Sequence, residues 1–202
     1  MDKPFSEACE RNKAPILACL QPLYAPLCSV FEVGSGTGQH ALHFAAAMPH
    51  LRWQCSETPA QLEVLHRGLA DQTLPNLPPP LAFAAGQPWP AQTADAVFTA
   101  NTLHIMGWHE VQQLFDGLAG WLPENGLFTV YGPFNYGGRF TSDSNARFDA
   151  SLRAADPRRG LRDFEAVDAL AHAAGLQLLE DRAMPANNRC LTWRRGAAGA
   201  LR

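Results

Sequence analysis

The chain has 202 residues, of which 47% are hydrophobic and 17% charged, with a formal net charge of -3. This length fits one domain with a sizeable core, or one domain with a small cap, and argues against two full domains. A slightly acidic chain without a run of Lys or Arg argues against a nucleic-acid partner, and the absence of about 18 consecutive apolar residues argues against a membrane span.

The N-terminal segment is charged and has no apolar stretch, so we expect no signal peptide. Five cysteines are widely spaced and include no CxxC pair, which argues against a disulfide framework or a zinc site. The sequence therefore predicts a cytoplasmic protein without a bound metal.

Helical and strand patterns alternate along the chain. Residues 5–23 have apolar positions at helical spacing, interrupted by Pro15, and predict one helix or two short ones. Further helices are predicted at 40–48, 59–69, 109–121, 146–154 and 164–174. Strands are predicted at 29–33, 51–55, 81–84, 94–99, 127–131, 176–183 and 189–193.

Such alternation indicates an α/β fold with a parallel sheet. Six of the sixteen prolines lie between residues 74 and 90, where they predict an irregular connection rather than a domain boundary. The segment 132–148 is rich in Gly, Asn and Ser and is interpreted as a loop that leads into a helix. We therefore expect a single domain over residues 1–202.

The most informative stretch is VFEVGSGTGQH, in which an apolar strand passes through Gly34, Gly36 and Gly38 into a helix. Glycine permits positive φ and close approach of the backbone to a ligand, and the free N–H groups of the following helix favour an anionic group. A GxGxxG dinucleotide fingerprint would need glycine at position 39, which is Gln39 here. The loop therefore favours S-adenosylmethionine over NAD as the cofactor.

Two acidic residues accompany this loop. Glu32 precedes the first glycine by two residues and could accept hydrogen bonds from loop N–H groups or from the ammonium of the ligand. Glu57 lies at the end of the next strand, a position that suits two ribose hydroxyls. A glycine turn that merely packs a strand against a helix is the structural alternative.

With these residues placed, the chain resembles class I S-adenosylmethionine-dependent methyltransferases, and more closely the family that includes methyltransferase-like protein twenty-six. The resemblance covers nearly the whole chain. It rests on the segments SEACERNKAPIL, VFEVGSGTGQH, DAVFTANTLHIMGW, LFTVYGPFNYGGRFTSDSNARFDASLRAADPRRGLRD and MPANNRCLTWRR.

The resemblance implies a Rossmann-like, seven-stranded, mostly parallel sheet with helices on both faces and one antiparallel strand near the C-terminus. It also implies that the three glycines approach the methionine moiety, that Glu57 holds the ribose and that Asn101 lines the cofactor pocket. Residues 1–25, with Asn12, are implied to form a helical lid over the cofactor; a solvated helix face is the alternative.

One departure from the family pattern concerns adenine. Such enzymes often carry an acid after the third strand, but this chain has Phe83-Ala84-Ala85-Gly86 there. Backbone groups or Gln87 could take the place of the acid.

Methyl transfer depends strongly on positioning the acceptor, and a general base assists when a hydroxyl or ammonium must lose a proton. His104 follows the fourth strand and is the candidate base, with a structural histidine as the alternative. Tyr131, Asn135 and Tyr136 lie at and after the end of the fifth strand and are candidates for acceptor binding, unless that segment is an ordinary surface loop.

Three further groups have competing interpretations. His40 and His43 have ligand-like spacing but no third ligand nearby in the sequence, which argues against a metal site. The arginines at 158, 159 and 162 could meet an anionic acceptor or be solvated. Asn187 and Asn188 could contribute to the site or equally be hairpin turn residues, because Asn tolerates left-handed conformations.

The leading hypothesis is an S-adenosylmethionine-dependent methyltransferase with a small-molecule acceptor, whose identity and oligomeric state the sequence leaves open. A protein that binds S-adenosylmethionine or a partner without catalysis is the first alternative, because the adenine acid is missing and no base is unambiguous. An NAD-dependent oxidoreductase is the second alternative, disfavoured by Gln39.

Overall fold

The computed structural model describes residues 3–197, and its main sheet has seven strands. Their order is β3 (Leu81–Ala82), β2 (Arg52–Glu57), β1 (Ser29–Val33), β4 (Ala96–Ala100), β5 (Leu127–Gly132), β9 (Asn188–Arg195) and β8 (Leu176–Met184). Strand β1 is parallel to β2 and β4, whereas β9 is antiparallel to β5 and β8. The mostly parallel α/β sheet with one antiparallel strand near the C-terminus is thereby confirmed.

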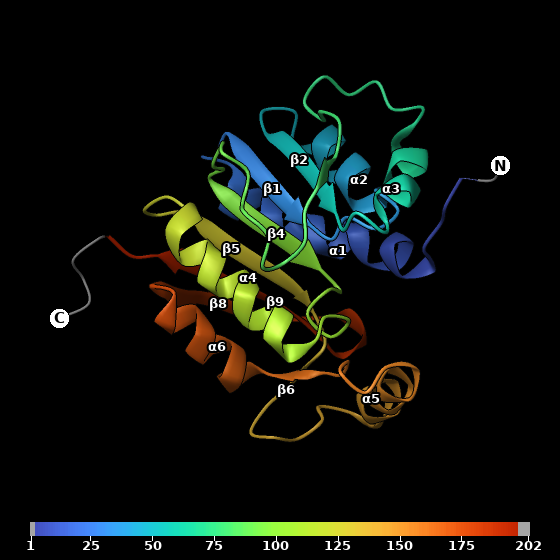
Figure 1. Cartoon of the computed structure of the whole chain (residues 1–202), viewed down its shortest axis with the longest axis vertical. Helices are drawn as coiled ribbons and strands as arrows, with labels where there is room; N and C mark the ends of the chain where they lie inside the picture. Colours follow the sequence, from blue (N-terminus) through green and yellow to red (C-terminus); the bar gives the residue numbers. More distant parts are fainter. Residues whose placement is uncertain (1–2, 198–202) are drawn as a thin grey trace. The chain divides into compact units, whose positions relative to one another are not determined.

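The strands and helices form two compact units (Figure 1). Within the described residues, the first unit contains 3–84 together with Ala94–Thr99, and the second contains Ala85–Thr93 together with 100–197. The single domain over 1–202 with a lid over 1–25 stays a prediction. Residues 1–2 and 198–202 of that predicted domain lie outside the described residues.

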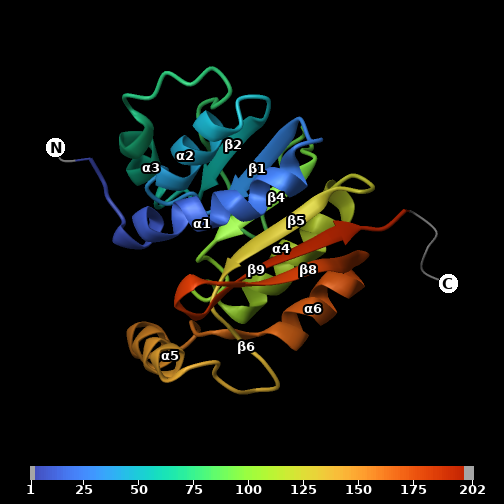
Figure 2. The same cartoon turned by 180° about the vertical axis from the view of Figure 1, so that it is seen from behind.

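The first unit has three helices (Figure 2): α1 (Glu7–Tyr24), α2 (Gln39–Ala47) and α3 (Leu62–Leu69). Helices α2 and α3 pack against β2, and α1 packs against α2. Helix α1 begins after Ser6, whose hydroxyl accepts a hydrogen bond from the Cys9 amide, and it continues through Pro15 and Pro22. Its buried stripe includes Ile16 and Leu20. Packing of this stripe compensates for the backbone hydrogen bonds that proline removes, so one helix forms rather than two.

An aromatic cluster forms the centre of the first unit. The rings of Phe44, Trp53 and Phe98, from α2, β2 and β4, have centroids 5.3 to 5.8 Å apart in tilted and edge-on arrangements. Aromatic pairs in such geometry stabilise a core beyond their buried area. This cluster holds α2 against β2 and β4, and α2 is the helix into which the glycine loop leads.

Helix α3 approaches that loop through a glycine. A Cβ atom placed on Gly68 would lie 2.0 Å from the carbonyl oxygen of Thr37, which is in the loop. No side chain fits at this distance. Gly68 therefore allows the backbone of α3 to touch the backbone of the glycine loop.

In the second unit, α4 (Trp108–Trp121) and α6 (Phe164–Ala173) contact each other, and α6 packs on β8 (Figure 1). The buried rings of Phe115, Phe128 and Trp193 join α4 to β5 and β9, with centroids 5.3 to 6.4 Å apart. Helix α5 (Asp143–Ala155) begins after Ser142, whose hydroxyl accepts from the Asn145 amide.

The segment after β5 contains a strand that the sequence does not predict. Residues Phe134–Asn135 form β6, which pairs in parallel with β7 (Arg162–Asp163). The interpretation of this part of the segment as loop was wrong. A two-residue strand has no periodic pattern of its own, and its partner lies far away in the sequence, so the pairing is a tertiary event.

The β8–β9 hairpin turns through the short helix η1 (Pro185–Asn187). Asn187 has a φ of 58°, as predicted for a left-handed turn residue, and Ala186 has a φ of 56°. Asn188 instead has a φ of -89° and begins β9. Of the two asparagines predicted in the turn, one therefore supplies the left-handed conformation.

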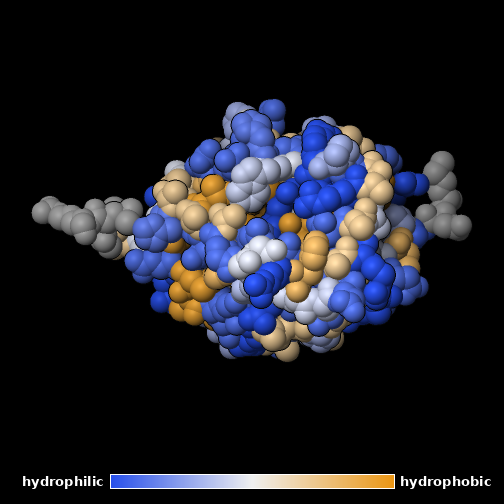
Figure 3. Space-filling view, turned by 90° about the horizontal axis from the view of Figure 1, so that it is seen from below, coloured by the Kyte–Doolittle hydropathy of each residue, from blue (hydrophilic) through white to orange (hydrophobic). Residues whose placement is uncertain are grey.

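Apolar side chains reach the surface in small areas among hydrophilic ones (Figure 3). Exposed large apolar residues of the second unit are Ile105, Phe140, Phe148, Leu178 and Leu179. Among residues 3–197, no helix combines the length and apolar character that a bilayer crossing requires.

We predict that Gly68→Ala destabilises the protein by about 1 to 3 kcal/mol, because the new methyl group would overlap the Thr37 carbonyl. Gly120→Ala in α4 is the matched control, since its Cβ would meet nothing within 4 Å and alanine favours helix. Denaturant unfolding of both variants provides the measurement. Equal stability of Gly68→Ala and wild type would show that α3 and the loop do not touch.

Candidate functional site

The glycine loop reverses the chain between β1 and α2 with three left-handed residues. Gly34, Gly36 and Gly38 have φ values of 71°, 57° and 77°. A Cβ on Gly36 would meet nothing within 4 Å, whereas one on Gly38 would press against the side chain of Leu69. The loop thus has a packed side at Gly38 and an open side at Gly36, where a ligand could approach the backbone.

Glu57 lies against this loop. It is the last residue of β2, its exposed fraction is 8%, and its Oε2 atom accepts a hydrogen bond of 2.9 Å from the Gly36 amide. Its Oε1 atom accepts from the Thr58 amide at 2.8 Å. A carboxylate has about four acceptor positions, so both oxygens can still accept from hydroxyl groups. The structure thus brings together the loop and the residue predicted to hold a ribose.

Glu32 is more deeply buried, with an exposed fraction of 1%. Its Oε2 atom accepts a hydrogen bond of 2.7 Å from Trp53 Nε1, and its carboxyl group also bonds to the Ser35 side chain. Burial raises the pKa of Glu32 to about 7, and the nearby Glu57 carboxylate adds to this, while the two hydrogen bonds oppose it. Glu32 is therefore bonded to the glycine loop through the Ser35 side chain.

Asn12, predicted to contact the cofactor, is bonded to the helix that follows the loop. Its Oδ1 atom lies 2.6 Å from Nε2 of His40, which is buried and stacks on Phe44. Burial lowers the pKa of His40 to about 4, so the ring is neutral at pH 7. Among residues 3–197, no three His, Cys, Asp or Glu side chains gather as a metal site.

Gln39 has a structural role that the sequence analysis missed. Its Oε1 atom accepts from the Ser6 amide at 2.6 Å and from the Thr37 hydroxyl at 2.9 Å, and its Nε2 atom donates to Glu10. One side chain thereby joins the start of α1 to the glycine loop. The sequence shows Gln39 as a departure from a dinucleotide motif, but it contains no signal for these partners.

The segment predicted to receive adenine follows β3. Phe83 is buried and packs edge-on against Phe31 with centroids 5.4 Å apart. Gln87 is exposed. The substitution of Gln87 for the missing acid stays a prediction.

Two candidate residues of the second unit lie together after β4. Asn101 has a φ of 59°, and its amide donates to the Tyr131 carbonyl at 2.8 Å. A Cβ on Gly132 would lie 3.7 Å from His104 Nδ1 and 4.0 Å from Asn101 Oδ1. Gly132 therefore lies close to a polar atom of both side chains, and its lack of a Cβ leaves space beside them.

The His104 imidazole is neutral at physiological pH. Its exposed fraction is 5%, and burial, followed by the positive charge of Arg162, lowers its pKa to about 4. Phe148 lies edge-on to the ring with centroids 5.3 Å apart. In the described part of the chain, neither ring nitrogen has a hydrogen-bond partner. The ring can therefore accept a proton, as a weak base.

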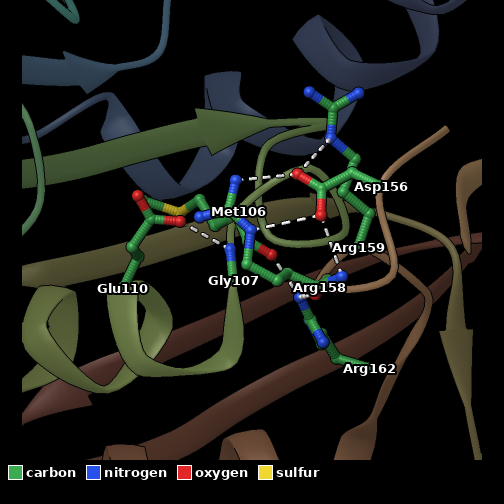
Figure 4. Close-up of polar contacts among 7 residues, drawn as sticks. All are labelled: Met106, Gly107, Glu110, Asp156, Arg158, Arg159 and Arg162. Atoms are coloured by element: carbon green, nitrogen blue, oxygen red, sulfur yellow. Dashed lines mark hydrogen bonds and ion pairs between the residues drawn. The ribbon is translucent and has the colours of Figure 1, made fainter.

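The three arginines after α5 have different partners (Figure 4). Arg158 makes hydrogen bonds and an ion pair with Asp156, and Arg159 Nε lies 3.9 Å from Asp156. Arg162 is buried, and its guanidinium donates to backbone carbonyls instead. The structure thus divides a cluster that the sequence presents as one basic group.

The candidate acceptor residues Tyr131, Asn135 and Tyr136 differ in their surroundings. Tyr131 is buried in β5. Asn135 is buried in β6, and its Oδ1 atom has no hydrogen-bond partner. The Tyr136 hydroxyl donates to Asp181 at 2.8 Å, and burial and the Asp181 charge raise the pKa of that hydroxyl.

Solved structures that are similar to this chain in fold include several methyltransferases. An O-methyltransferase family protein from Burkholderia thailandensis superposes with a TM-score of 0.82 at 16% identity, over 95% of this chain and 58% of the other. Human N-acetylserotonin methyltransferase in complex with SAM gives 0.79 at 15%, over 94% and 53%. An O-methyltransferase family 2 protein from Planctomyces limnophilus in complex with apigenin gives 0.72 at 13%, over 91% and 62%.

These likenesses confirm the class I methyltransferase fold, and the chain spans little more than half the length of the structures it resembles. A family model described as "Protein of unknown function (DUF938)" matches residues 3–195, which is nearly the whole chain. The chain therefore belongs to the DUF938 family.

Proposed function

We propose that this protein binds S-adenosylmethionine and transfers its methyl group to a small molecule. The observation that carries the proposal is the open glycine loop at the end of β1, with the Glu57 carboxylate bonded to the Gly36 amide. Strand β1 lies between β2 and β4, the position in an open α/β sheet where ligands bind beyond the strand ends. The relationship to methyltransferase-like protein twenty-six and a cytoplasmic location are parts of the same proposal.

The residues of the first unit fit such a cofactor. Space beside Gly36 admits a ligand against the backbone, and free acceptor positions on Glu57 suit the two ribose hydroxyls. Gly34 and Gly38 shape the loop, while Glu32 supports it through Ser35. Residues 1–25, with Asn12, form the lid in this proposal, since Glu10 and Asn12 of α1 are bonded to Gln39 and His40.

S-adenosylmethionine supplies an activated methyl group on a sulfonium, so the chain mainly has to position an acceptor. His104 is proposed to take a proton from the acceptor, because its ring is neutral and its nitrogens are unbonded within the described residues. Asn101 is proposed to line the cofactor pocket. Tyr131, Asn135 and Tyr136 are proposed to contact the acceptor. The Tyr136 hydroxyl is already bonded to Asp181 and its ring is stacked on Phe164, so Tyr136 has less of its side chain free for this role than Asn135.

A non-catalytic role in binding S-adenosylmethionine is the second candidate. The low pKa of His104 favours this non-catalytic role. A base with a pKa of about 4 has little affinity for the proton that it would have to remove from an acceptor at pH 7. Calorimetry with S-adenosylmethionine, S-adenosylhomocysteine and NAD tests cofactor binding. Turnover of labelled S-adenosylmethionine against a metabolite extract then separates an enzyme from a binding protein. Binding without turnover of any extract fraction would favour the second candidate.

We predict that Gly36→Val abolishes cofactor binding, because the side chain would occupy the open space beside the loop and strain a φ of 57°. Gly175→Val is the control, since Gly175 also has a positive φ and open space but follows α6. Calorimetry on folded protein provides the measurement. Wild-type affinity in folded Gly36→Val would refute the loop assignment.

Glu57→Ala should weaken S-adenosylmethionine binding by about 1 to 3 kcal/mol, the cost of losing hydrogen bonds to a charged group. Glu57→Gln should have a milder effect, because the amide oxygen can still accept from Gly36. Glu63→Ala, an exposed acid in the first turn of α3, is the control and should bind normally. If Glu57→Ala binds as tightly as wild type, the ribose is held elsewhere.

His104→Ala should leave cofactor affinity nearly unchanged and lower turnover by about 10²-fold to 10⁴-fold, the usual contribution of a general base. The exposed His109→Ala in α4 is the control. Protonation removes the base, so wild-type turnover should be flat near pH 7 and fall to half as the pH drops to about 4. Unchanged turnover per folded molecule of His104→Ala would remove His104 from the mechanism.

A further inference from the structure

The turn that carries His104 is a short segment between β4 and α4. Two hydrogen bonds close it, from the Ile105 and Met106 amides to the Thr102 carbonyl, at 2.8 and 3.0 Å. Such a turn leaves the carbonyl oxygens of Leu103, His104 and Met106 to find donors elsewhere. The position of the imidazole depends on these donors.

All three carbonyls receive donors from residues 160–162. The Gly160 amide donates to the His104 carbonyl at 3.0 Å, and Arg162 Nε donates to the Leu103 carbonyl at 2.9 Å. Arg162 Nη2 donates to the Met106 carbonyl and, at 3.1 Å, to the Arg158 carbonyl (Figure 4). One planar guanidinium thus binds the turn on both sides of His104.

Arg162 itself is firmly held. Its exposed fraction is 9%, and its guanidinium lies over the Trp108 ring, 5.8 Å from the centroid. It belongs to β7, where it pairs with Phe134 of β6, and the adjacent Leu161 amide donates to Asp149 at 2.8 Å. The guanidinium therefore connects the His104 turn to the β6–β7 pair and, through the neighbouring Leu161, to α5.

We propose that Arg162 is a positioning residue, which holds the turn over residues 102–106 and thereby fixes the His104 imidazole for its role in methyl transfer. The proposal rests on the proposed function of His104. Lysine could not replace Arg162 fully, because an ammonium lacks the planar fork that reaches several carbonyls at once. The three carbonyl contacts, rather than an exposed charge, distinguish Arg162 from Arg158.

Charge supports the same assignment. The positive charge of Arg162 is a cause of the low pKa of His104, second to burial. In the described part of the chain, no ion pair joins Arg162 to a carboxylate. Burial and the charge of Arg153 lower the pKa of Arg162, while the charges of Asp149 in α5 and Glu110 in α4 raise it. Glu110 accepts from the Gly107 amide, and Asp149 is paired with Arg153. The guanidinium charge is thus left to disfavour an imidazolium at His104.

The test compares Arg162→Lys and Arg162→Met with Arg158→Gln, a control in the same loop whose exposed side chain bonds to Asp156. We expect amide hydrogen exchange at Ile105 and Met106 to accelerate by about tenfold or more in both Arg162 variants and to be unchanged in the control. NMR titration should show the His104 pKa near 4 in wild type and Arg162→Lys and about one unit higher in Arg162→Met.

Neither readout needs methyl transfer, so this proposal and the proposed function can fail separately. If transfer is found, kcat should fall in both Arg162 variants while the affinity for S-adenosylmethionine is retained. If Arg162→Met does not fold, Arg162→Lys still tests the turn through its amide exchange. Wild-type exchange at Ile105 and Met106 in folded Arg162→Lys would overturn the proposal, as would an equal His104 pKa in wild type and folded Arg162→Met.

Discussion

The hydrogen bond from the Gly36 amide to Glu57 joins the ends of two parallel strands, and the first unit is organised around it. Parallel strands end at one edge of a sheet, where the backbone amides of a following loop need acceptors. Glu57 supplies one acceptor, and three left-handed glycines let the loop turn toward it. Helix α3 contacts the backbone of the loop at Gly68, and Gln39 joins the loop to the start of α1.

Each unit buries an ionisable side chain, and the two side chains are stabilised by different partners. In the first unit, Glu32 has a pKa raised to about 7 by burial, and two hydrogen bonds hold its carboxyl group below the loop. In the second unit, Arg162 keeps a buried guanidinium by binding backbone carbonyls. Its charge and the burial of His104 favour a neutral imidazole. Each unit therefore contains a titratable group whose protonation follows from local packing rather than from its ordinary pKa.

The sequence determined most of the architecture of this protein. Helical and strand periodicity predicted the main-sheet strands and the helices, with ends shifted by a few residues, because these elements bury faces that repeat at fixed spacing. Alternation of the two patterns predicted the parallel sheet. The glycine loop and the proximity of Glu57 were also predictable, since a loop that follows β1 and an acid that ends the neighbouring strand must reach the same edge.

Tertiary structure alone decided which side chains surround each candidate. The β6–β7 pair, the attachment of α1 through Gln39 and the carbonyl contacts of Arg162 join segments far apart in the sequence. The bond between Tyr136 and Asp181 likewise occupies a hydroxyl that the sequence presents as free for an acceptor. Periodicity encodes which face of an element is buried, but a hydrogen bond depends on distances of about 3 Å that exist once the chain has packed.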